Sequence, residues 1–437
     1  MVELPQNISA LVALLSGQGW KCWLTGTTAL RALGADVHIQ QQEMLSDASP
    51  EKCVELLALI SELGQDSKLS LESLSGRTLE ETLAQRGVTI NGIAVTPDGA
   101  TVDPFEGTAH MQARQIRTIE APDLAFRKNP ILLLKVARLI SDTDYAPSSD
   151  VRRYALRDSG NILDIEDRGR HWGIQINELL QRKFISAALQ WLQDNRVLGF
   201  IMPEIAAMVD FEKSCSAHHK DIWDHTKQVT QKTKLELVVR WAALCHDIGK
   251  VWTRTVTRNG KVHFFRHEEH GALLFESIAT RFKLNTKLSY RVAYVIRHHS
   301  RVNLYRSDWT DSAVRRLIRE SEGHLDELIT FSKADYTTKR QDRIAEMQSQ
   351  ISDLESRIVT LSEEDAKVPP LPSGLGVAIM KNFQLAPSPL IGELKRLLET
   401  AVESGELPER ADDALYLGWL KDDPACVERI SSAGGQT

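Results

Sequence analysis

The sequence predicts an α+β protein that is mostly α, with a small α/β head followed by a long helical body. Strand-like segments gather before residue 120: KCWLTG is a short apolar run into a glycine turn, and VTINGIAVTPDGATVDPF is a hairpin turning at Pro97-Asp98-Gly99. From about residue 121 the apolar residues recur at helical spacing, as in ILLLKVARLI and LVVRWAALCHDIGK. These two patterns define the predicted fold class.

We expect four parts: a head over residues 1–120, a helical neck over 121–210, an all-α domain over 211–340 and a helical tail over 341–437. In the third part, TRTVTRNGKVHFF interrupts the helices as a small hairpin turning at Asn259-Gly260. In the tail, apolar residues of 344–361 alternate steps of three and four, which is the seam pattern of a coiled coil. The seam predicts either a homodimer through 344–361 or a helix packed along its own chain.

Charge and cysteine content limit the class of protein. The 437-residue chain has a net charge of −6, which argues against coating nucleic acid by bulk charge but leaves room for a local basic groove. Its five cysteines are scattered and form no CxxC or zinc spacing, so we expect free thiols in a reducing compartment. The first residues lack the basic lead-in of a signal peptide, and no apolar run approaches the roughly 18 residues of a membrane span. We therefore predict a cytoplasmic protein.

The sharpest chemical pattern is a set of histidines and aspartates in the 211–340 part. His246 and Asp247 end the apolar helix WAALCHDIGK, and a divalent cation that binds phosphate oxygens favours such a mixed imidazole and carboxylate shell. Further candidates are His225 on a preceding predicted helix and, downstream, His270, His299 and Asp335, each at an apolar–polar boundary of a predicted helix. Within RHHS, His298 is the alternative to His299, and we expect His267 at the surface or against substrate.

This order of residues resembles the HD phosphohydrolase superfamily. The resemblance implies one metal ion with four ligands, His225, His246, Asp247 and Asp335. It also implies that His270 and His299 bind a second ion. Asp247 and Lys250 are then the catalytic positions, with Lys250 on the substrate phosphate and the metal activating a bound water. The ligand set predicts one or two divalent ions but does not distinguish Mn, Fe, Co, Ni, Zn and Mg.

The rest of the chain resembles the bacterial CCA-adding tRNA nucleotidyltransferases and their poly(A) polymerase relatives. Two head segments are similar to those of that family, TLEETLAQRGVTINGIAV and TVDPFEGTAHMQARQIRTI. Two neck segments are similar as well, FRKNPILLLKVARL and VLGFIMPEI. At the exit of the HD part and in the tail, the similar segments are ADYTTKRQDRIAEMQSQISDLESRI and PSPLIGELKRLLETAVESGELP. The resemblance runs nearly end to end and implies RNA, in particular tRNA, or a nucleotide as the partner.

The head departs from that family where the chemistry lies. Nucleotidyl transfer in this fold uses two carboxylates one residue apart on a strand, which clamp two Mg²⁺ ions. In LGADVHIQ the pair becomes Asp36 and His38, and an imidazole cannot replace a bridging carboxylate on Mg²⁺. The phosphate turn keeps Gly26 but not its second glycine, and Gly87 replaces the aspartate of the family's Arg-Arg-Asp. We therefore expect an inactive, degenerate head.

The sequence thus predicts a metal-dependent phosphoric ester hydrolase of the HD type. Its substrates would be RNA 3′ ends or nucleotides, with phosphatase or 2′,3′-cyclic phosphodiesterase chemistry on tRNA-related molecules. Two alternatives remain: an active CCA-adding tRNA nucleotidyltransferase, and a non-catalytic tRNA-binding protein. Arg114, Arg117 and Arg138 are candidate RNA contacts, although scattered arginines are also common on solvated surfaces.

Overall fold

The computed structural model describes residues 4–37, 41–62, 69–213, 222–336, 340–366, 370–424, 426–427 and 429–430. The chain forms two compact units, Met1–Leu354 and Glu355–Thr437, and each is described by itself. Most of the described residues are helical, and the strands are concentrated in the head, so the predicted fold class is confirmed. Within the described ranges, no helix is long and apolar enough to cross a membrane.

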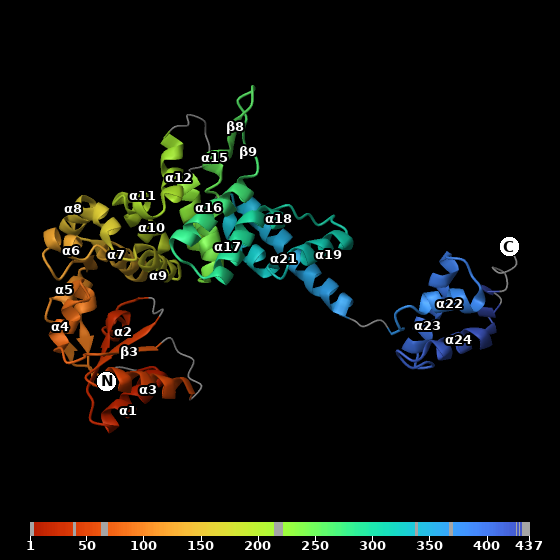
Figure 1. Ribbon diagram of the computed structural model, residues 1–437, viewed down its shortest axis with the longest axis horizontal. Helices are drawn as coiled ribbons and strands as arrows, with labels where there is room; N and C mark the ends of the chain where they lie inside the picture. The colour runs from red at the N-terminus through yellow and green to blue at the C-terminus, as the bar shows by residue number, and fades with distance from the viewer. Residues whose placement is uncertain are drawn as a thin grey trace. The chain divides into compact units, whose positions relative to one another are not determined.

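The head is built on one five-stranded sheet in the order β3-β2-β1-β4-β5 (Figure 1). Its strands are β1 Cys22–Thr25, β2 Gln42–Ser46, β3 Leu69–Ser73, β4 Ala94–Val95 and β5 Thr101–Val102. The pairing is antiparallel except between β2 and β3, which are parallel and joined through helix α3. The predicted strand at KCWLTG and the predicted hairpin around Pro97 are both present.

Five helices accompany the sheet: α1 Gln6–Gly17, α2 Gly26–Ala32, α3 Pro50–Glu62, α4 Leu79–Ala84 and α5 Gly107–Gln112. Helix α2 begins at the residue that follows β1, so Gly26 lies at a sharp turn with φ +57°. A positive φ is a conformation that glycine adopts without strain. The strand, the glycine turn and the helix therefore form one tight unit, and β2 pairs with β1 directly beside it.

The neck consists of α6 Pro122–Lys128, α7 Leu132–Thr143, α8 Ser149–Asp158, α9 Arg168–Leu180, α10 Ile185–Asp194, α11 Val197–Ile201 and α12 Pro203–Lys213. Helix α7 is buried along nearly its whole length, and it packs against α9 and α10. A buried ion pair ties α7 to the connection between α9 and α10, with Arg182 Nη1 and Asp142 Oδ1 2.8 Å apart. Both partners are almost fully enclosed, so the loss of either would leave an uncompensated buried charge.

The next helices surround the predicted metal ligands. They are α13 Ile222–Lys232, α14 Leu237–Cys245, α15 Lys250–Thr253, α16 His267–Arg281, α17 Thr286–His298, α18 Ser300–Asn303, α19 Asp311–Glu320 and α20 Leu325–Asp335. Helix α14 is central, because it is buried from Val238 to Cys245 and packs against α13, α17 and α20. The predicted hairpin at Asn259-Gly260 is present as β8 Arg254–Val256 and β9 Val262–Phe264.

Helix α21, Gln341–Ala366, contains the predicted coiled-coil seam. Ile351, Leu354 and Leu361 are buried within the single chain, and the Tyr305 hydroxyl donates to the Asp353 carboxylate. A dimer through 344–361 stays a prediction. Beyond it, α22 Leu375–Phe383, α23 Pro389–Glu403 and α24 Asp413–Asp422 enclose a hydrophobic core of their own.

The close packing of α9 against the end of α16 gives a test of the fold. A Cβ added at Gly173 would lie 2.3 Å from the Phe282 carbonyl oxygen, whereas one added at Gly199 of α11 would meet nothing within 4 Å. Gly173→Ala should therefore destabilise the protein by about 1–3 kcal/mol through overpacking. Gly199→Ala, the matched control in a helix, should stabilise it by up to about 1 kcal/mol. Thermal unfolding followed by circular dichroism measures both, and equal melting temperatures would contradict this packing.

Candidate functional site

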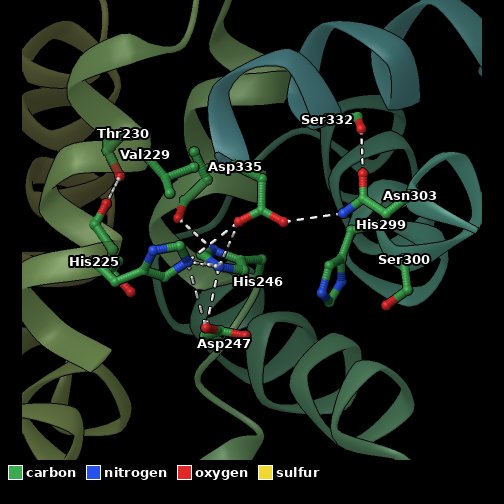
Figure 2. A network of polar contacts seen from close by, with 12 residues as sticks. His225, Val229, Thr230, His246, Asp247, His299, Ser300, Asn303, Ser332 and Asp335 are labelled. Atoms are coloured by element: carbon green, nitrogen blue, oxygen red, sulfur yellow. Dashed lines mark hydrogen bonds and ion pairs between the residues drawn. The ribbon is translucent and has the colours of Figure 1, made fainter. Parts of the chain in front are cut away.

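The predicted metal ligands come together at the ends of helices that surround α14 (Figure 2). His225 lies on α13, His246 caps the carboxyl end of α14, and Asp247 follows it. His299 caps the carboxyl end of α17, and Asp335 is the last residue of α20. The side chains of His246, Asp247 and His299 are almost fully buried. Because the apolar helices fix the backbone, these polar groups are held against one another with little freedom to separate.

In this cluster, imidazole nitrogens and carboxylate oxygens lie close enough to one another to bind the same metal ion. His225 Nε2 lies 3.2 Å from Asp335 Oδ1, and His246 Nε2 lies 3.2 Å from Asp247 Oδ2. The two Nε2 atoms of His225 and His246 are 3.3 Å apart. His225 Nε2 is also 3.8 Å from Asp247 Oδ2. The four predicted ligands thus point at a single small volume.

Hydrogen bonds to the backbone set the direction of three imidazoles. The Nδ1 atoms of His246, His267 and His299 lie 2.9, 3.0 and 2.7 Å from carbonyl oxygens, each three residues earlier in the chain. A carbonyl accepts only, so Nδ1 carries the proton and Nε2 of a neutral ring keeps its lone pair. Lone pairs and carboxylates directed at one volume repel one another unless a cation lies between them. This pattern is typical of histidine metal ligands.

The pKa values of His299 and of the two carboxylates agree with a neutral imidazole and ionised carboxylates. Burial opposes protonation of His246, but the charges of Asp247 and Asp335 raise its pKa. Burial, helped by the neighbouring His246, lowers the pKa of His299 to about 4. Burial opposes ionisation of Asp247, but the charges of His246 and Lys250 outweigh it and hold its pKa well below the usual range. Burial likewise opposes ionisation of Asp335, while a hydrogen bond with His225 lowers its pKa to about 2. Neutral imidazole and ionised carboxylate are the forms that bind metal.

The donor atoms fit two divalent ions. His225, His246 and Asp335 form one group of ligand atoms within 4.8 Å of one another, and Asp247, His267 and His299 form a second. The Asp247 Oδ1 atom is buried and has no hydrogen-bond partner among the described residues. A buried carboxylate oxygen without a partner is costly, and a metal ion would satisfy it. Asp247 would then bridge the two ions with its two oxygens.

One predicted ligand lies elsewhere. The ring of His270 packs against Trp252 with centroids 6.2 Å apart and belongs to neither ligand group. His267 takes its place, with Nε2 3.8 Å from Asp247 Oδ1. The reason is local: α16 begins at His267, directly after Arg266 in the left-handed conformation, so the first histidine of RHEEH faces the cluster. His298, the alternative to His299, packs on Tyr294 instead.

Other polar groups complete the cluster. Lys250 Nζ lies 2.8 Å from Asp247 Oδ2, and the Asn303 amide donates to Asp335 Oδ2 over 3.2 Å. A cavity of about 280 Å³ opens onto the ligands, and its lining residues are Ile222, His225, His246, Asp247, Lys250, His299 and Asp335. A small anion beside the ions would meet the ammonium group of Lys250 there.

A second polar site lies in the head, beside the Gly26 turn. Glu43 is on β2 opposite Thr25, and its backbone N–H donates to Thr28 Oγ1 over 2.9 Å. A Cβ added at Gly26 would lie 2.5 Å from a Glu43 carboxylate oxygen, so the absence of a side chain lets this carboxylate reach the turn. Arg86 Nη1 lies 3.3 Å from Glu43 Oε2, and Arg86 Nη2 lies 2.8 Å from Glu72 Oε2. Glu43 is thus the acid at the strand–turn–helix unit.

The residues expected in the head site lie elsewhere. Asp36 is in a loop between α2 and β2, its side chain is 97% exposed, and its Oδ2 atom lies 3.9 Å from Lys183 Nζ. His38 lies outside the described residues. The prediction that Asp36 lies on a strand is wrong, because β2 begins at Gln42. In the sequence, the run QEMLS could have indicated this strand, because it ends shortly before the helix that starts at Pro50.

Gly87 and the three arginines occupy different environments. Gly87 has φ +79° at the turn after α4, and its Cβ position faces a methyl group of Leu132. Arg138 forms an ion pair with Glu178 and is half-buried, which ties it to the neck. Arg114 and Arg117 are exposed, and the Arg114 guanidinium lies over the Tyr145 ring at 5.4 Å. Contact with RNA stays a prediction for these residues.

Comparisons with known proteins find similarity to tRNA nucleotidyltransferases over much of the chain. Residues 217–358 match the family model of the HD domain. An A-adding tRNA nucleotidyltransferase from Deinococcus radiodurans is 27% identical over 79% of this chain and 80% of the relative. A multifunctional CCA protein from Pseudomonas fluorescens is 31% identical over 47% of this chain, which spans about half (51%) of that relative. The CCA-adding enzyme of Bacillus stearothermophilus, solved in complex with CTP, has the same fold, with a TM-score of 0.56. The two chains are 18% identical, and the match covers 99% of this chain and 100% of that chain.

These findings correct the predicted function. The expectation of an HD phosphohydrolase with an inactive head is wrong, because the relative that covers most of the chain is a nucleotidyltransferase. The similarity to a CCA-adding enzyme along the whole chain agrees with that relative. The findings favour the alternative, a CCA-adding type of enzyme, while the predicted HD domain and the predicted family resemblance are confirmed.

The two histidines of RHEEH give a matched test of the ligand geometry. His267→Ala removes a member of the second ligand group and should weaken Mn²⁺ binding by at least about tenfold. His270→Ala should leave Mn²⁺ affinity and stoichiometry unchanged, because its ring contacts Trp252 rather than the ligands. Isothermal titration of the metal-stripped full chain with Mn²⁺ measures both. A loss of metal in His270→Ala with normal binding in His267→Ala would refute the assignment.

Proposed function

We propose that this chain, which matches the HD domain family model over residues 217–358, is a member of the bacterial CCA-adding tRNA nucleotidyltransferase family and adds nucleotides to the 3′ end of tRNA. The observation that carries this proposal is the similarity to an A-adding enzyme, which extends over 79% of this chain and 80% of that relative. The Bacillus stearothermophilus enzyme of the same fold binds CTP. The proposed substrates are a tRNA end and a nucleoside triphosphate.

The Gly26 turn supports a nucleotide site in the head. The side-chain hydroxyls of Thr25 and Thr27, on either side of Gly26, are buried and have no hydrogen-bond partner among the described residues. Buried hydroxyls without a partner cost free energy, which ligand oxygens near the turn would offset. Arg86 lies at the same place and supplies a positive charge for a phosphate. The turn therefore offers neutral donors and a cation together.

The head carboxylates do not fit a two-ion clamp. Glu43 is an acid, but the residue two positions before it is Gln41, and no group of three metal-ligating side chains occurs in the described part of the head. We therefore assign no step to a metal ion there. Glu43 is placed beside the turn, and its proposed role is that of a general base for the attacking hydroxyl of the tRNA. Arg86 would hold this carboxylate in place through their ion pair.

The HD cluster has a separate proposed role, the binding of divalent metal. Its six ligands are His225, His246, Asp247, His267, His299 and Asp335. Imidazole-rich sites accept Mn, Fe, Co, Ni and Zn, and cellular availability decides which is bound. When bound, such ions supply positive charge for phosphate oxygens beside Lys250. Metal binding here does not depend on nucleotide addition in the head.

Nucleotide addition gives the direct test. Purified full chain with tRNA that lacks its terminal nucleotides should incorporate labelled ATP or CTP. Glu43→Gln should lower the rate by about 10²–10⁴-fold, because it removes the proposed base while it keeps size and hydrogen bonding. Asp36→Ala, which changes an exposed acid in the adjacent loop, should leave the rate unchanged. Tight tRNA binding with no extension by the unaltered chain would overturn the proposal.

A further inference from the structure

The segment from Lys250 to His267 differs in charge from the rest of the chain. Its sequence KVWTRTVTRNGKVHFFRH contains five Lys or Arg and no Asp or Glu, in a protein of net charge −6. It also contains three Phe or Trp side chains. It forms α15 and the β8–β9 hairpin, which stands out from α16 in Figure 1. A local cluster of cations and aromatic rings is the composition that binds single-stranded polynucleotides.

The two faces of the hairpin have different surroundings. Arg254 and Phe264 are paired across the strands and face Phe211 of α12, with the Arg254 guanidinium 5.6 Å and the Phe264 ring 6.4 Å from the Phe211 ring centroid. His263 and Phe265 lie on the other face because side chains alternate along a strand. This alternation fixes one side of the hairpin against the protein and leaves the other open.

The open face presents a flat pair of rings to solvent. The rings of His263 and Phe265 are stacked, with centroids 5.1 Å apart and planes within 6° of parallel. Phe265 is 67% exposed. A large exposed aromatic side chain is unfavourable in water, but it provides a stacking surface for an unpaired base. A base in a duplex is already stacked and cannot use this surface, so the geometry favours a single strand.

Positive charge surrounds the stacked rings. Arg258 and Lys261 flank the hairpin turn, and Arg266 follows Phe265. All three are exposed, and Arg266 Nε lies 4.0 Å from Glu269 Oε2. Such side chains neutralise phosphates along a strand and release its bound counterions. The rings and the charges therefore match the two parts of a nucleotide, the base and the phosphate.

Both ends of the segment touch the metal cluster. Lys250 Nζ is 2.8 Å from one oxygen of Asp247, and His267 Nε2 is 3.8 Å from the other. The stacking rings are thus a few residues from the cavity that opens onto Asp247. We propose that the β8–β9 hairpin is a binding surface for a single-stranded polynucleotide whose path continues into the HD cavity. This site is distinct from the head and does not depend on nucleotide addition there.

The test measures binding of a fluorescent oligonucleotide of about 12 nucleotides to the full chain by anisotropy, in RNA and DNA arms. Phe265→Ala should weaken binding about tenfold through lost stacking. Arg258→Glu with Lys261→Glu should weaken it further and lower the slope of log affinity against log salt by about 1.4, or two phosphate contacts. The matched control, Lys287→Glu with Arg316→Glu, makes the same charge change on exposed sites of α17 and α19 and should bind normally.

The location of the strand is tested by crosslinking. An oligonucleotide with a terminal 4-thiouridine should crosslink to peptides within 250–270, and Phe265→Ala should reduce that yield. Unaltered affinity in both hairpin variants would overturn the proposal, as would equal loss in the control. Loss of binding to anionic lipid vesicles with normal oligonucleotide binding would assign the hairpin to membranes instead. Extension of tRNA is measured separately, so failure of the proposed transferase leaves this result interpretable.

Discussion

The buried position of α14 constrains the centre of this protein more than any other feature. The helix is enclosed by α13, α17 and α20, and it ends at His246 and Asp247 inside the protein. Its partners contribute imidazoles and a carboxylate at their own ends, so lone pairs and negative charge converge where water is scarce. Backbone carbonyls fix the imidazole tautomers, which prevents the rings from turning away. A cation offsets this repulsion, and the helix packing and the metal chemistry therefore depend on each other.

The order of the ligands could be predicted because His246, His299 and Asp335 lie where helices end, while His225 lies near the start of α13. His225, His246, Asp247 and Asp335 mark changes from apolar to polar sequence, and the structure places them together. The choice between His267 and His270 could not be made in this way. Both lie in RHEEH, and the side that faces the cluster depends on where α16 begins. The left-handed backbone of Arg266 sets that start, and tertiary packing rather than periodicity determines it.

The head shows a different limit of sequence reasoning. Several of its strands and turns could be predicted from composition, but the position of β2 could not, because composition does not fix where the loop after α2 ends. Cross-strand pairing of Thr25 with Glu43 fixes the register, and a shift by one residue would reverse the face of every side chain. The sequence alone favours Asp36 as the acid on the strand, whereas the acid that lies on β2 is Glu43. Only the cross-strand pairing shows which of the two acids is on the strand.

Similarity to a family and local chemistry answer different questions about this chain. Similarity over the head, neck and HD domain establishes the shared architecture, but the groups at each site decide what they bind. At the head, one guanidinium is shared between two carboxylates: Arg86 pairs with Glu43 and Glu72. A phosphate that binds Arg86 must compete with both acids. If it displaces them, the Glu43 carboxylate is released from its ion pair with Arg86. Binding of an anionic ligand and the freedom of the strand carboxylate are therefore coupled through a single side chain.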